Sequence, residues 1–183
     1  MALPGIDWEA FRGIPGVDRK LLRALRRRRN PPSPAYDEVR LILRQAWKVD
    51  PGDLEALATD VHAASELPTE FGRRSGLLLA DGQGFLVEPD HHADCGTSGL
   101  FPKVLQVRPS SDDGRWNLRV LHELAHKLLD KHYPNHSHAD VWALTLALAI
   151  PRASYCRRHE ARHVPRWAVA LRGETARAVA RAA

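Results

Sequence analysis

The chain has 183 residues, of which 44% are hydrophobic, and these values suit one domain or a small domain with extensions. Its two cysteines cannot form a disulfide framework, and the first residues show no secretory signal. No apolar run approaches the roughly 20 residues that a membrane span needs, so we expect a cytoplasmic protein with no membrane partner.

The net charge of +5 is unevenly distributed along the chain. One basic run extends from Arg19 to Arg29, and a second basic region extends from Arg152 to Arg181. Such clusters attract nucleic acid or acidic partners through a salt-sensitive Coulomb attraction, and they also serve as solubilising arms. The basic segments therefore leave nucleic-acid binding open as an alternative function.

Residues 1–35 are expected to form a basic N-terminal extension and linker, with a short helix around residues 18–29. Prolines at positions 31, 32 and 34 interrupt regular structure there, so the folded domain is expected over residues 36–183. Apolar spacing predicts helices over 36–47 and 54–65, with a capping turn at Asp50–Asp53 between them.

Short apolar runs in the middle of the chain predict strands. Two short apolar runs, 75–80 and 84–88, flank a break that contains Asp81-Gly82, which indicates a β-hairpin. Residues 103–108 are a further strand candidate. The sequence therefore predicts a small antiparallel sheet.

The C-terminal half is predicted to be helical. One helix is expected from Arg115 to about Asp130, with capping candidates in 110–113, and a second from Asp140 to Ile150, where Pro151 stops it. Arginine-rich helices are expected after residue 151.

The helix predicted over 115–130 carries His122-Glu123-Leu124-Ala125-His126, an HExxH motif. Because a helix rotates about 100° per residue, His122 and His126 lie on one face and can both bind one metal ion. Glu123 lies beside the first of these ligands, where it can accept a proton from a metal-bound water. This pattern predicts a zinc-dependent hydrolase in which Glu123 is the catalytic base.

A catalytic zinc site usually has three protein ligands. The third is expected at the start of the next helix, where Asp140 and His138 compete. Asp140 is favoured, because the small residues Ala143 and Ala147 would let the two helices approach closely. His132 and His136 are weaker candidates.

Cys95 lies in a polar loop with His91, His92 and Asp94. The loop matches no standard zinc module, so a free thiol in a polar loop is the simplest interpretation. A fourth zinc ligand or a second metal site is the alternative.

The segment Arg115–Leu121 directly before the motif, and Asp140–Ile150 followed by Pro151, resemble the ImmA/IrrE family of HExxH metallopeptidases over roughly residues 37–170. In that family the third ligand is a glutamate, whereas this chain has Asp140. If the family pattern is aligned on Pro151 instead, His138 occupies the position of the third ligand. The N-terminal helix-turn-helix domain that many members carry has no counterpart in residues 1–35.

The resemblance implies a mainly helical, zincin-like α+β domain with its small sheet packed against the HExxH helix. It also implies a regulatory peptidase whose protein substrate is a DNA-binding repressor. The residue that stabilises the oxyanion stays open among Tyr133, His132, His159 and His163. The alternative function is a non-catalytic zinc-containing regulator that binds a protein or nucleic acid through its basic segments.

Overall fold

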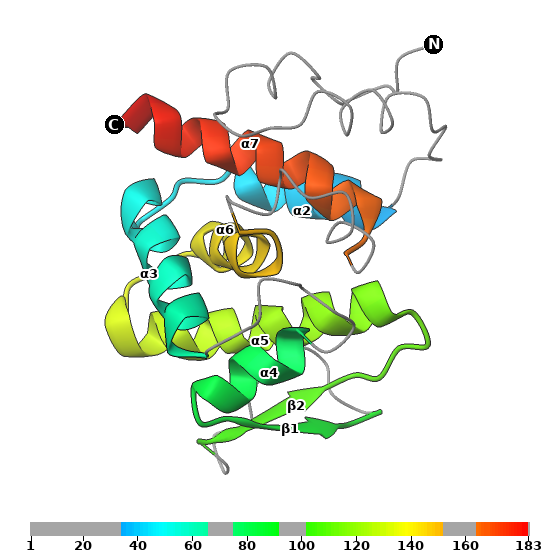
Figure 1. Cartoon of the computed structure of the whole chain (residues 1–183). Coiled ribbons are helices and arrows are strands. Elements are labelled where there is room, and N and C mark those ends of the chain that lie inside the picture. Colours follow the sequence, from blue (N-terminus) through cyan, green and yellow to red (C-terminus); the bar gives the residue numbers. More distant parts are fainter. Residues whose placement is uncertain (1–33, 66–74, 92–101, 152–163, 183) are drawn as a thin grey trace.

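The computed structural model of the chain describes residues 34–65, 75–91, 102–151 and 164–182 (Figure 1). Its elements are α2 (Pro34–Leu43), α3 (Pro51–Ala64), α4 (Ser75–Gly82), β1 (Leu86–Pro89), β2 (Val104–Val107), α5 (Asp113–His132), α6 (His138–Ala149) and α7 (Arg166–Ala182). The helices predicted over 36–47, 54–65, 115–130 and 140–150 are confirmed as α2, α3, α5 and α6, and the strand predicted over 103–108 is confirmed as β2. Helical structure after residue 151 is confirmed for α7.

The ends of the helices follow from local side-chain chemistry. At the start of α3 the Asp50 carboxylate accepts a hydrogen bond from the backbone N–H of Gly52 at 2.7 Å, and Pro51 occupies the first turn. At the start of α5 the Asp112 carboxylate accepts from the backbone N–H of Arg115 at 2.8 Å. Asp112 therefore sets where the helix that carries the motif begins.

Helix α6 lies in the centre of the described structure. Figure 1 shows it end on, between α2 and α7 on one side and α5 on the other. Almost every residue from Ala139 to Ala149 is buried, as expected for a helix that is apolar on all sides. The core therefore forms around α6, with α3 packed against it as well.

The β-hairpin prediction was wrong, because residues 75–82 form helix α4. The run from Leu77 to Ala80 has no apolar–polar alternation, so its periodicity does not separate a strand from a short buried helix. Helix α4 packs against α5 and buries Gly76 close to the backbone of Asn117, where a Cβ atom would lie 3.1 Å from the Asn117 carbonyl oxygen.

The prediction of an antiparallel sheet was also wrong, because β1 and β2 pair in parallel. Once residues 75–82 are helical, β1 has no hairpin partner upstream and pairs instead with β2, with Leu86 opposite Val104. Leu105 and Val107 of β2 are buried, and β2 packs against α5. The prediction of a mainly helical domain with a small sheet beside the motif helix is thus confirmed, with the strand direction corrected.

Several predictions fall outside the described residues. These are the basic extension up to residue 33, the loop residues His92, Asp94 and Cys95, and the histidines His159 and His163. Of the helices that are described, none combines the length and the apolar character that crossing a membrane requires.

Candidate metal centre

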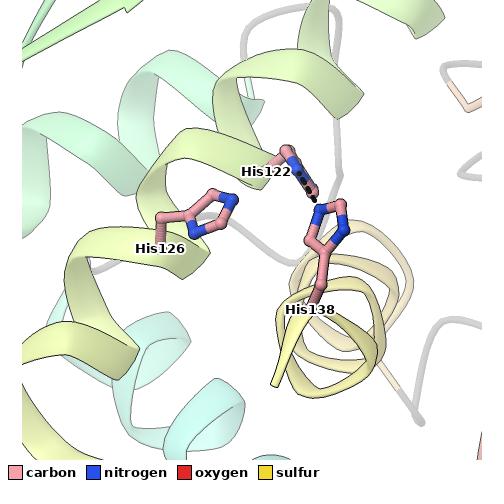
Figure 2. A group of neighbouring side chains, drawn as sticks. All are labelled: His122, His126 and His138. Carbon is pink, nitrogen blue, oxygen red and sulfur yellow. Dashed lines mark hydrogen bonds between the residues drawn. The ribbon is translucent and has the colours of Figure 1, made fainter. Parts of the chain in front are cut away.

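Helices α5 and α6 bring three histidines together (Figure 2). His122 and His126 project from neighbouring turns of α5, and His138 projects from the first residue of α6. One nitrogen from each ring takes part in a group whose members all lie within 4.8 Å of one another. Among the described residues this is the group of histidine, cysteine and acidic side chains suited to hold a metal ion.

The spacing of the nitrogens fits a tetrahedral ion. His122 Nε2 and His138 Nε2 are 3.4 Å apart, and the rings of His122 and His126 have their centroids 4.9 Å apart. Two nitrogens that each lie about 2.0–2.1 Å from a tetrahedral zinc ion are themselves about 3.4 Å apart. The Nε2 atoms of His122 and His138 are therefore already at a separation that a shared cation requires.

The three rings are held in the neutral form. Burial lowers the pKa of His122 to about 3, with further lowering from His126 and His138. Burial, followed by the neighbouring histidines, lowers the pKa of His126 to about 4, and burial also lowers the pKa of the more exposed His138. Neutral imidazoles keep the lone pairs that a metal needs, so these rings are ready to bind a cation at neutral pH.

Glu123 directly follows His122 in α5. Its side chain is 3% exposed, and its Oε2 atom is buried with no hydrogen-bond partner among the described residues. Burial raises the pKa of Glu123 to about 7, against a smaller lowering by Lys127. Buried carboxylate oxygens normally have partners, so this one is available to a group outside the described residues.

Asp140, the favoured third ligand from the sequence, has a different role. Its carboxylate accepts hydrogen bonds from the backbone N–H of Ser137 at 2.7 Å, from Ser137 Oγ at 2.8 Å and from the backbone N–H of Lys48 at 3.1 Å. It forms a capping box at the start of α6 and is not among the clustered residues. The group that could hold a metal ion thus contains His138, the competing candidate, and not Asp140.

Two residues near His122 were not anticipated from the sequence. Thr145 Oγ1 lies 3.3 Å from His122 Nδ1, and the Trp142 ring centroid lies 4.3 Å from that of His122. Both side chains come from α6, about one and two turns after His138. Their spacing from His138 in the sequence could have indicated both residues, because residues one and two turns apart share a helix face.

The remaining histidines near the site have other contacts. His136 Nδ1 donates to the carbonyl oxygen of Tyr133 at 2.9 Å, and His136 Nε2 lies 3.8 Å from Asp130 Oδ1. His132 is exposed at the end of α5, and Tyr133 packs against the core. No observation selects one of these residues as the oxyanion donor.

We compared the chain with protein-family models, with curated proteins and with solved structures, and none of them matches it. A functional conclusion therefore has to come from the motif and from the geometry of the site.

Proposed function

We propose that this chain is a zinc-dependent peptidase with a zincin-like site, in which His122, His126 and His138 hold the metal and Glu123 is the catalytic base. The observation that carries the proposal is the meeting of three neutral imidazoles, one of which directly precedes Glu123, whose buried Oε2 atom has no hydrogen-bond partner in the described part of the chain. Imidazole nitrogens suit zinc, although other divalent ions accept the same ligands.

The ligand number supports a catalytic centre over a structural one. Structural zinc sites are closed by four protein ligands, whereas catalytic sites commonly have three and leave a position for water or substrate. Exposure increases across the group, from His122, which is buried, through His126 to His138, which is exposed. The site is therefore closed on the side of α5 and accessible from the side of His138.

Zinc bound by these residues would polarise the scissile carbonyl and lower the pKa of a coordinated water toward about 7. The protein's own contribution is the placement of Glu123. Its carboxylate takes a proton from the attacking water and delivers it to the leaving amine. No side chain or backbone group of the described ranges pairs with Oε2, which leaves that oxygen free of them for this transfer.

A peptide bond is proposed as the substrate because the HExxH motif is typical of metallopeptidases. The segments Arg115–Leu121 and Asp140–Pro151, with their resemblance to the ImmA/IrrE family, support a regulatory substrate such as a DNA-binding repressor.

The test compares the wild-type protein with Glu123→Gln after purification without added metal. We expect both proteins to contain one equivalent of zinc, and we expect the variant to lose at least about 100-fold in peptide cleavage, the low end of a general-base contribution. Glu88→Gln is a matched control, because Glu88 is an exposed carboxylate on β1. Cleavage that persists in Glu123→Gln would remove Glu123 from the mechanism, and zinc binding without cleavage in the wild type would favour the non-catalytic regulator.

A further inference from the structure

Helix α6 contacts the His122 ring at three places. His138 Nε2 faces His122 Nε2 at 3.4 Å, Trp142 covers the ring at a centroid distance of 4.3 Å, and Thr145 Oγ1 lies 3.3 Å from His122 Nδ1. His122 is 5% exposed and Thr145 is fully buried, so water does not compete for the contact with Thr145. The orientation of the first ligand is thus set by the helix that carries the third.

The hydrogen bonds of Thr145 define the direction of its contact with His122. A threonine hydroxyl has one proton to donate and two lone pairs that can accept. Thr145 Oγ1 donates its proton to the backbone carbonyl oxygen of Val141 at 2.7 Å. Towards His122 the hydroxyl can then act only as an acceptor, so His122 Nδ1 must carry the proton.

We propose that Thr145 is a positioning residue that holds His122 as its Nδ1–H tautomer, so that the Nε2 lone pair faces the metal position. A neutral imidazole carries one ring proton, and a proton on Nδ1 leaves Nε2 unprotonated. Nε2 is the His122 nitrogen that faces His138, and it is the atom that must bind the cation. The role toward the metal rests on the proposed function, whereas the tautomer is a property of the metal-free protein.

This arrangement explains why α6 supplies both groups. His138 and Thr145 are two helical turns apart, which places them on one face of α6. A shift of α6 along α5 would therefore move the third ligand and the support of the first ligand together. Loss of a group that hydrogen-bonds a ligating histidine and orients its ring typically weakens metal binding by about 10–100-fold.

The first test reads the tautomer directly in the metal-free wild-type protein. Two-bond proton–nitrogen correlation spectra of 15N-labelled histidine separate a protonated Nδ1 from a protonated Nε2. We expect His122 to be protonated on Nδ1, with its signal assigned by comparison with His122→Gln. A proton on Nε2 of His122 would overturn the proposal, and this readout needs no Thr145 variant to fold.

The second test measures zinc affinity by competition with a chelator for Thr145→Val and Thr145→Ser. Valine matches threonine in shape but leaves Nδ1–H without an acceptor, so we expect zinc to bind about 10–100-fold more weakly at unchanged stoichiometry. Serine retains the hydroxyl that accepts from Nδ1–H. We therefore expect the zinc affinity of Thr145→Ser to lie within roughly a few-fold of the wild-type affinity. Unchanged affinity in Thr145→Val would contradict the proposal.

A matched control is Thr59→Val. Thr59 Oγ1 donates to the Glu55 carbonyl oxygen at 2.8 Å, the same bond to the preceding helical turn that Thr145 makes, but on an exposed face of α3. We expect this variant to keep wild-type zinc affinity. Neither readout uses peptide cleavage, so an inactive but zinc-binding protein would refute the peptidase and leave the role of Thr145 intact.

Discussion

At the scale of single residues, the Asp140 side chain holds the start of α6, where His138 lies, without belonging to the histidine group. It is fully buried, and it accepts hydrogen bonds from the start of its own helix and from the backbone N–H of Lys48 before α3. Its oxygens are therefore already satisfied. Turning them towards a cation would leave these part-buried N–H groups without acceptors, which costs at most about 1–3 kcal/mol for each.

We expect Asp140→Ala to lower the free energy of unfolding by about 2–3 kcal/mol, because it removes a helix cap together with the tie to Lys48. The number of imidazole ligands should stay the same. Urea unfolding measures the first effect, and X-ray absorption of the zinc-loaded variant measures the second.

The matched control for Asp140 is Asp53→Ala, which removes an exposed carboxylate from the first turn of α3. We expect that change to cost less than about 1 kcal/mol, the size of a favourable charge at a helix N-terminus. Loss of one metal ligand in Asp140→Ala, with all three histidines still in place, would show that Asp140 does bind the ion.

The closeness of His122 and His126 could be predicted from the sequence, because a motif within one helix has a known geometry. The choice between Asp140 and His138 could not, since it depends on where α6 begins. With Ser137 as the cap, His138 is the first helical residue and faces α5, whereas Asp140 folds back onto the cap. Ser137 followed by an acidic residue at the third helical position was the available clue.

At the scale of elements, the long amphipathic or apolar segments were predictable and the short ones were not. Helices α5 and α6 have strong periodic or continuous apolar character and clear N-terminal caps. Residues 75–82 form a short apolar stretch without clear periodicity, and in the fold they are a helix packed against α5. With these residues helical, β1 pairs with β2 in parallel, and local sequence does not specify that partner or direction.

The C-terminal end of α6 is held by side chains from two other helices. Arg172 of α7 donates from Nε to the Ile150 carbonyl oxygen at 3.0 Å and also pairs with Glu55 of α3. His62 of α3 is largely buried nearby. Its pKa is lowered to about 4, mainly by burial and to a lesser extent by the charge of Arg172, while the carbonyl groups of Leu148 and Ala147 oppose that lowering.

We expect His62 to make folding stability fall as the solution is acidified. Above a pH of about 6.5 the ring is neutral in both states, so it contributes no pH dependence. Between about pH 6.5 and the folded-state pKa of about 4, His62 takes up a proton only in the unfolded chain. The free energy of unfolding therefore decreases by up to about 1.4 kcal/mol for each pH unit of acidification. Below that range the effect levels off.

The measurement for His62 compares urea unfolding of wild type and His62→Gln in metal-free buffer from pH 7.5 to pH 4. His122 and His126 have lowered pKa values too and titrate in both proteins, so the difference between the proteins isolates His62. We expect the free energies of unfolding of the two proteins to approach each other by up to about 3 kcal/mol as the pH is lowered. Equal pH dependence in the two proteins would mean that His62 is not held neutral by the fold.

At the scale of the whole molecule, a metal at this site would join the helices on which the other elements pack. Helix α5 carries α4 and the strand β2, and α6 contacts α2, α3 and α7 (Figure 1). The histidine group spans the interface between α5 and α6, with ligands on both. An ion held there would therefore stabilise the packing of one half of the described structure against the other.

We expect zinc to raise the thermal stability of the protein. A ligand at about 100 times its dissociation constant adds about 2.7 kcal/mol if it binds only the folded state. For a chain of this size that corresponds to a rise of about 5–11 °C in Tm. Differential scanning calorimetry with zinc and with a chelator measures the rise.

The same measurement on histidine variants tests which residues bind the ion. His126→Ala and His138→Ala should each lose most of the zinc-dependent rise, because two imidazoles bind zinc far more weakly than three. His132→Ala is the control, since His132 is exposed at the end of the same helix and outside the group. If His138→Ala keeps the full zinc-dependent rise in Tm, the third ligand is not His138. The metal would then not connect α5 and α6 through that residue.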